Sequence, residues 1–222
     1  MSVLDLHEPI NMKLCLFISS LIAFQSFAQT EKITIEFKSN VFESNKDFEI
    51  ETLRFYISSI QIDFDGDSSY YEPNSYHLVD LSDSTSVSFE LEADQTKSIS
   101  SLKFNIGTDS LINVSGALDG DLDPILGMYW AWNTGYINFK LEGKQSNSYK
   151  QHNFEYHIGG YSSPYSTCRE VELEVKSREI LIEVDVLEFL SLASTISSSI
   201  IMPGKEAKLC ADIYQKIFVV DE

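Results

Sequence analysis

Two tryptophans, separated by one residue, are the most distinctive chemical feature of this chain. Trp130 and Trp132 are its only tryptophans, and they lie in segment 127–143, which has the pattern of a β-strand. Side chains at positions i and i+2 of a strand point to the same face, so both indoles are expected on one face. Two large oxidisable aromatics placed in this way either pack in the hydrophobic core, which is common in β-sandwiches, or form a functional site.

Histidine is the second source of candidate chemistry. His157 ends a predicted strand just before the Gly/Ser/Pro-rich loop 159–166, and His77 lies in Tyr76–Asp80, also a predicted strand. Neutral imidazole is a good ligand for copper or zinc, and a strand holds such a ligand rigidly. The alternative for each residue is a half-buried histidine whose ring is satisfied by a hydrogen bond.

Two acidic turns, Asp63–Asp67 and Asp119–Asp123, resemble the opening of a calcium loop. The first fails the EF-hand pattern, because its glycine is misplaced and Asn74 stands where a bidentate glutamate is required. Asp-Gly pairs are also ordinary hairpin turns, so calcium is the weaker reading of both segments.

Motifs of catalytic machinery are missing from the sequence. The chain has no G-x-S-x-G, no H-E-x-x-H and no phosphate-binding Gly-rich loop. An exported chain with few histidines and no such motif is expected to bind a ligand rather than to act as an enzyme.

The N-terminal residues have the features of a secretory signal peptide. A single positive charge at Lys13 precedes the apolar run Leu14–Phe24, and a small residue, Ala28, precedes the expected cleavage point. The run is too short for a membrane-spanning helix, which needs about 20 apolar residues. Residues 1–29 are therefore predicted to be an extension with a signal peptide. The mature chain is expected in the periplasm or outside the cell, with no membrane span.

The net charge limits the classes of binding partner, and the cysteine content bears on whether the chain forms a disulfide. The formal net charge is −18, which argues against nucleic acid and anionic membranes as partners. Cys168 and Cys210 remain after processing, and an even pair in an oxidising compartment predicts a disulfide. Two buried free thiols are the alternative.

The remaining pattern is mostly that of β-strands with alternating apolar residues, separated by turns rich in Gly, Asp, Asn and Ser. A change of alternation at Ser58-Ser59 predicts a β-bulge, and helices are expected over Leu187–Ser194 and Lys205–Phe218. We predict an all-β fold, one antiparallel β-sandwich domain over residues 30–222 with a short C-terminal helix. The predicted strands are Lys32–Lys38, Thr52–Phe64, Tyr76–Leu81, Ser86–Leu91, Ser101–Ile106, Gly135–Leu141, Asn153–Ile158, Glu170–Lys176 and Glu179–Val186.

An ordered series of short motifs resembles the MbnP-like family, exported copper-binding proteins named after the methanobactin-associated protein P. The resemblance covers roughly residues 32–160, and its most specific part is the Met-Tyr-Trp-x-Trp run. The motifs are Phe55-Tyr-Ile-Ser58, Tyr76-His-Leu-Val-Asp80, Leu102-Lys-Phe-Asn-Ile-Gly107, Gly127-Met-Tyr-Trp-Ala-Trp132, Gly135-Tyr136, Leu141-Glu-Gly143 and Phe154-x-Tyr-His-Ile-Gly159.

The resemblance implies a β-rich domain that binds copper through histidines together with kynurenine, the product of tryptophan oxidation. It also implies a partner, a di-haem protein of the MbnH/cytochrome c peroxidase-like type, which carries out that oxidation. Carried onto this chain, Trp130 or Trp132 is the oxidised residue, His157 is the first ligand candidate and His77 the second. Met128 adds a soft thioether suited to Cu(I).

Sequence patterns and resemblance together predict an exported copper-binding protein for copper storage, uptake or delivery. The alternative from another class is a metal-free interaction module whose aromatics only pack the core. A calcium-stabilised β domain is a weaker third reading. The copper hypothesis requires the imidazole of His77 or His157 within a few ångströms of the other imidazole or of one indole, and it fails if each histidine lies isolated on a different side of the sandwich. Calcium requires three or more carboxylate oxygens converging from one loop.

Overall fold

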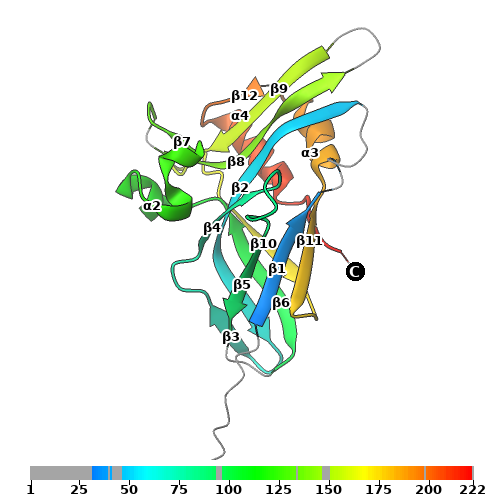
Figure 1. The fold of residues 1–222 in the computed structure, drawn as a ribbon. Coiled ribbons are helices and arrows are strands. Elements are labelled where there is room, and N and C mark those ends of the chain that lie inside the picture. The colour runs from blue at the N-terminus through cyan, green and yellow to red at the C-terminus, as the bar shows by residue number, and fades with distance from the viewer. Residues whose placement is uncertain are drawn as a thin grey trace, which may run out of the picture. The chain divides into compact units, whose positions relative to one another are not determined.

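The computed structural model describes residues 32–39, 41, 47–93, 97–133, 135–146, 151–197 and 199–221. The predicted signal peptide, residues 1–29, lies outside the described residues. The described chain folds into two packed β-sheets with two helices at one end of the interface between them (Figure 1). None of the described helices is long and apolar enough to cross a bilayer.

The smaller sheet has four strands in the order β13-β11-β1-β5. Alternation in β1 buries Ile33, Ile35 and Phe37 on one face. β1 pairs antiparallel with β5 but parallel with β11, so the sheet is mixed, and the prediction of a purely antiparallel sandwich is wrong in this detail. The strands are β1 (Lys32–Lys38), β5 (Ser88–Glu92), β11 (Glu179–Val184) and β13 (Phe218–Val220).

The larger sheet follows the order β10-β6-β2-β8-β9-β12, with β3 and β4 paired to β2 and β7 paired to β8. It is also mixed, because β12 runs parallel to β9. Its strands are β2 (Phe48–Phe64), β3 (Ser68–Tyr71), β4 (Tyr76–Asp80), β6 (Ile99–Ile106), β7 (Tyr129–Trp130), β8 (Gly135–Ser146), β9 (Gln151–Gly159), β10 (Arg169–Glu174) and β12 (Ser199–Ile200).

Strand β2 lies in the centre of the larger sheet, between β6 and β8. It pairs with β8 along its first half and with β6 along its second half. The register with β6 shifts between Ser58 and Gln61, and Ser59 has a positive φ of 55°. The predicted bulge is therefore confirmed, and it lets one 17-residue strand bend between two partners.

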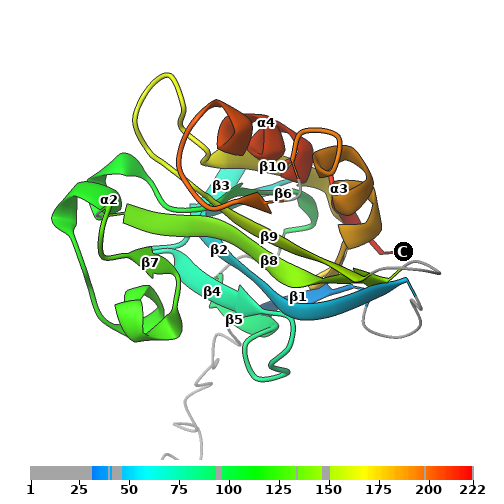
Figure 2. The same ribbon diagram turned by 90° about the horizontal axis from the view of Figure 1, so that it is seen from above.

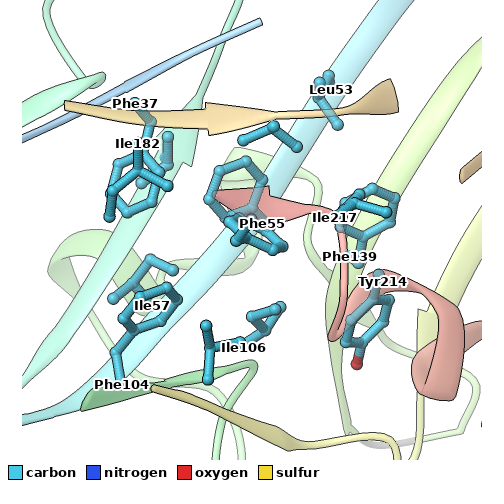
Figure 3. Packing of buried hydrophobic residues seen from close by; sticks show 14 of the residues in the cluster. Phe37, Leu53, Phe55, Ile57, Phe104, Ile106, Phe139, Ile182, Tyr214 and Ile217 are labelled. Atoms are coloured by element: carbon cyan, nitrogen blue, oxygen red, sulfur yellow. The ribbon is translucent and has the colours of Figure 1, made fainter. Parts of the chain in front are cut away.

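The main core fills the space between the two sheets (Figure 3). Phe55 lies at its centre, with ring centroids 5.4 Å from Phe37 and 5.3 Å from Phe218, both edge-on. Helices α3 (Val186–Ala193) and α4 (Lys205–Tyr214), which confirm the two predicted helices, contribute to the same core; Tyr214 stacks on Phe139 of β8 at 5.2 Å. The side of the larger sheet that faces this core is called the inner face below.

The opposite, outer face of the larger sheet carries a second apolar cluster. The connection from β6 to β8 consists of a short helix α2 (Ser110–Ser115), two 3₁₀ turns, η1 (Gly120–Leu122) and η2 (Pro124–Leu126), and strand β7 (Figure 2). It supplies much of this cluster, through α2, η1 and the segment that forms β7. We call this set the outer cluster, and its buried members are Tyr56, Leu122, Met128, Trp130, Tyr136 and Ile137. Because Tyr56 follows the core residue Phe55 in β2, the two clusters lie on opposite faces of one sheet.

Candidate functional site

The two tryptophans occupy very different environments. Strand β7 ends at Trp130, and the chain turns at residues 131–133, where the amide of Asn133 donates to the carbonyl of Trp130. Trp130 is 6% exposed, whereas Trp132 is 63% exposed. The prediction of one continuous strand with both indoles on the same face is therefore wrong, because a turn intervenes. The turn still leaves the two rings adjacent, with centroids 5.9 Å apart.

Trp130 packs against the end of strand β9. A Cβ atom added to Gly159 would lie 2.7 and 2.9 Å from two carbons of the Trp130 benzo ring and 2.5 Å from the Tyr136 carbonyl oxygen. Only glycine leaves room for an indole in this position. Gly159 is two residues beyond His157 in the same strand, so both positions lie on the outer face, roughly 7 Å apart along the strand.

His157 forms a close pair with a carboxylate of the neighbouring strand. Its Nε2 lies 2.7 Å from Oε1 of Glu142, and the histidine side chain is 19% exposed. Burial alone would raise the pKa of Glu142, but hydrogen bonds from His157 and Thr52 hold the pKa below its usual value. An ionised carboxylate only accepts hydrogen bonds, so Nε2–H donates and Nδ1 is the ring nitrogen left to bind a ligand.

His77 forms a similar pair elsewhere. Its Nε2 lies 2.8 Å from Glu72, and its ring stacks on Phe89 with centroids 4.0 Å apart. His77 alternates with Leu78 along β4 and shares its face with Val79, which belongs to the main core. It therefore projects from the inner face, and the two imidazoles do not converge on one site.

Met128 lies on the same side of the sheet as Trp130. Its side chain is fully buried in the outer cluster, and its carbonyl accepts a hydrogen bond from the amide of Ile137. Ile137 pairs with Gly159, which links this segment directly to the end of β9. The structure therefore groups Met128, Trp130 and Trp132, and it places His157 on the same face, roughly 7 Å along β9 from the glycine that Trp130 covers.

The donors present fit only part of a copper site. His157 with Glu142, and His77 with Glu72, each give one imidazole and one carboxylate. Within the described ranges, no group of three or more His, Cys, Asp and Glu side chains is arranged to hold a metal ion. His157 can thus supply one nitrogen, with Glu142 orienting its ring. A complete site there needs a further donor, and Trp130, which packs over Gly159 two residues beyond His157, lies on this face.

The acidic turns have structural roles. The Asp63 carboxylate accepts hydrogen bonds from Ser69 and Gln61, which hold its pKa well below the usual range, and it also pairs with Lys103. In the second turn, Asp121 accepts from the amide of Leu78, and Asp123 from the amide of Ile125. These carboxylates satisfy backbone and side-chain donors, so neither turn directs several free oxygens at a common point.

The predicted disulfide between Cys168 and Cys210 is not formed in the structure, where both residues are free thiols. Cys210 is buried in the main core on α4. Cys168 lies just before β10, where Asp109 and Arg169 influence its ionisation. Burial raises the pKa of Cys168 to about 11 and that of Cys210 to about 12, so both remain protonated and unreactive at neutral pH.

A pocket of about 230 Å³ opens beside Trp130. Its other walls come from the loop after β9, through Tyr161 and Tyr165, and from the segment before α4, through Pro203 and Gly204. The sequence signals for it are weak, being only the Gly/Ser/Pro-rich loop 159–166 and the isolated Pro-Gly pair. Sequence patterns also do not single out Glu142, because nothing local marks it as the partner of a histidine 15 residues later.

Comparison with known proteins identifies a matching family and a solved structure with a similar fold. The family model described as MbnP matches residues 20–205. A solved structure, MbnP from Methylosinus trichosporium, is similar with a TM-score of 0.55 and 11% sequence identity, over 72% of this chain and 78% of that chain. No curated protein matches. At 11% identity the structural similarity supports a shared fold only. The relationship in sequence rests on the match to the family model.

Proposed function

The chain belongs to the MbnP family, and from that premise we propose that it is an exported copper-binding protein that stores, takes up or delivers the metal. It binds the metal and does not transform a substrate. This proposal takes the metal, the export and the modification below from the family resemblance, and it takes the site from the geometry of the outer face.

The observation that best supports the proposal is the packing of Trp130 over Gly159, two residues from His157. It brings the candidate ligand and the candidate modified residue to one end of one strand. His77, by contrast, projects from the inner face, and its partner is Glu72. We therefore assign the metal to His157 and exclude His77 from that site.

Each residue of the assigned site has a distinct role. Nδ1 of His157 is the protein nitrogen offered to copper, and Glu142 holds the ring through Nε2 and fixes its tautomer. Trp130, once oxidised to kynurenine by the di-haem partner, supplies an aromatic amine as a second nitrogen donor. Met128, in the same cluster as Trp130, is the thioether available to Cu(I).

Copper loading of paired histidine variants tests the proposal. His157→Ala and His77→Ala each remove a half-buried imidazole that is paired with a glutamate. His77→Ala also removes the stacking on Phe89, so it is a control with at least as large a structural cost. Copper content is measured by mass spectrometry on protein purified from the native exporter. The proposal predicts that His157→Ala loses the bound copper and that His77→Ala keeps it. Equal loss in both variants, or none in either, contradicts the assignment.

A metal-free interaction module is the second candidate, and two observations favour it. No three-donor metal cluster is found among the described residues, and the pocket beside Trp130 is walled by Tyr161 and Tyr165. Under this reading the tryptophans are unmodified and serve packing and contact. Protein that takes up no copper even in the presence of the di-haem partner would select this reading.

A further inference from the structure

Most of the buried polar side chains in the described part of the chain belong to one hydrogen-bonded group. Four of the six buried Ser, Thr and Asn side chains there are connected to one another: Thr108, Asn113, Asn138 and Thr167, each at most 3% exposed. We call these four residues the buried network. A buried polar group is unfavourable unless it is hydrogen-bonded, and every buried side-chain atom of this network has a partner. A fully satisfied network of this kind holds the segments around it in one arrangement.

Asn138 of β8 is the centre of the buried network. Its Oδ1 accepts from the backbone amide of Thr108 at 3.1 Å, and its Nδ2 donates to the hydroxyl of Thr167 at 2.9 Å. Gly107 has a φ of 102° and lies so close that a Cβ atom there would overlap with the Asn138 side chain. One amide group therefore links the beginning of the connection from β6 to β8 with the loop between β9 and β10.

Thr167 closes the loop that follows β9. Its amide donates to the carbonyl of Gly160 at 2.9 Å, and its hydroxyl donates to the same oxygen at 3.1 Å. The hydroxyl of Tyr214 in α4 donates to the Thr167 carbonyl. Gly160 directly follows Gly159, over which Trp130 packs. The buried network therefore holds the backbone against which the Trp130 indole lies.

Asn113 of α2 holds the other side of the same contact. Its Oδ1 accepts from the backbone amide of Tyr136 at 2.8 Å, and its Nδ2 donates to the hydroxyl of Thr108 at 2.9 Å. Gly135, the residue before Tyr136, pairs with Trp130 of β7. The network thus acts on Trp130 from the beginning of β8 as well as from the end of β9.

We propose that the buried network positions Trp130 against the end of β9, with the hydroxyl of Thr167 as the decisive contact. Thr167 and Asn138 are positioning residues, because they act through the backbone of Gly160 and not on the metal. Their effect on binding rests on the proposed function, in which Trp130 and His157 belong to one site. A shift of the backbone after Gly159 moves the indole relative to His157, and metal affinity depends on supporting contacts of this kind.

Thr167→Val tests the proposal, because it removes the hydroxyl and leaves a side chain of similar shape. Thr167→Ser keeps the hydroxyl and is the conservative variant. Thr108→Val removes the other hydroxyl of the network, so the test does not depend on the folding of one variant. Ser75→Ala is the control, since Ser75 is 5% exposed and its hydroxyl accepts from the amide of Ile60, outside the network.

The position of Trp130 is measured first, without copper. In a Trp132→Phe chain expressed without the di-haem protein, Trp130 is the only tryptophan, and its emission maximum and acrylamide quenching report its exposure. We expect a red shift and stronger quenching in Thr167→Val and Thr108→Val, and neither in Thr167→Ser or Ser75→Ala.

Copper affinity is measured second, by chelator competition, with the same four substitutions in the otherwise unchanged chain from its native exporter. We expect at least about tenfold weaker binding for the two valine variants. Thr167→Ser and Ser75→Ala should bind copper like the parent chain.

Valine variants that are folded by circular dichroism and keep the Trp130 emission of the parent overturn the positioning role. An equal red shift in Ser75→Ala also overturns it, because loss of any buried hydroxyl would then have the same effect. Unchanged copper affinity in the valine variants of a chain that binds copper overturns it as well, while the copper function stands. A parent chain that never loads copper contradicts the proposed function, and the fluorescence result still decides whether the network positions Trp130.

Discussion

The indole of Trp130 lies so close to Gly159 that a single added methyl group would collide with its ring at 2.7 Å. This contact fixes the depth of Trp130 above the larger sheet and its position along β9. Gly159 thus positions the candidate modified tryptophan on the same face of the sheet as the candidate ligand His157, two residues earlier in β9. The same contact explains why Trp130 is buried while Trp132, in the following turn, is exposed.

Gly159→Ala is expected to destabilise the fold and to displace the indole. The added carbon meets the ring and also the Tyr136 carbonyl oxygen at 2.5 Å, and backbone atoms cannot move as easily as side chains. Overpacking of this kind costs about 1–3 kcal/mol. Urea unfolding followed by tryptophan fluorescence measures both effects. Glu155→Ala, an exposed change on the same face of β9, is the control, and equal stability of the two variants would refute the packing argument.

Glu142→Gln is expected to weaken copper binding without unfolding the protein. The amide oxygen still accepts from His157, but the charge that orients and polarises the imidazole is lost. Substitutions at such supporting positions reduce metal affinity by about 10–100-fold. Competition with a copper chelator measures the affinity. Glu72→Gln makes the same change beside His77, and a comparable loss in that variant would argue against a site on the outer face.

Asp63 is expected to make the stability depend on acidity. Its carboxyl pKa is lower in the folded chain than the ordinary value of 3.8, chiefly because Ser69 and Gln61 donate to it. Its charged form therefore stabilises the fold fully at neutral pH, and this contribution decreases as the pH falls below about 4. Asp63→Asn should lower the free energy of unfolding at pH 7 by about 1–2 kcal/mol. The difference from the parent chain should shrink at pH 2–3 in urea titrations, and a difference that stays constant across this range would contradict the assignment.

Both cysteines are expected to remain free thiols in the folded protein. Burial keeps them protonated, so iodoacetamide should label neither Cys168 nor Cys210 under native conditions. In denaturant without reductant, the peptides carrying each residue should both gain one label. Peptides that stay linked until a reductant is added would show the disulfide that the sequence suggests and the structure lacks.

Local alternation was enough to predict the principal strands and both larger helices. β1 and β11 bury every second residue, and a change of parity locates the bulge in β2. Alternation does not predict whether neighbouring strands run parallel or antiparallel, because both kinds of pairing give the same alternation. The parallel pairs β1–β11 and β9–β12 are determined by the path of the whole chain.

The candidate site was predictable in its residue types but less so in its geometry. The sequence identifies Trp130 and His157, and strand alternation relates His157 to Gly159. It does not reveal that the chain turns after Trp130, because Trp-Ala-Trp continues the alternation of a strand. Nor does it show that His77 belongs to the other face, since the face on which a strand's odd residues lie depends on how that strand pairs.

Peptide mapping of protein from its native exporter, with copper measured on the same sample, tests the central claim most directly. The account predicts bound copper and a mass change from tryptophan to kynurenine on the peptide that carries Trp130 and Trp132, with fragmentation assigning it to Trp130. Unmodified tryptophans and no copper, even after copper loading with the di-haem partner present, would contradict the account and leave an interaction module with a packed aromatic cluster.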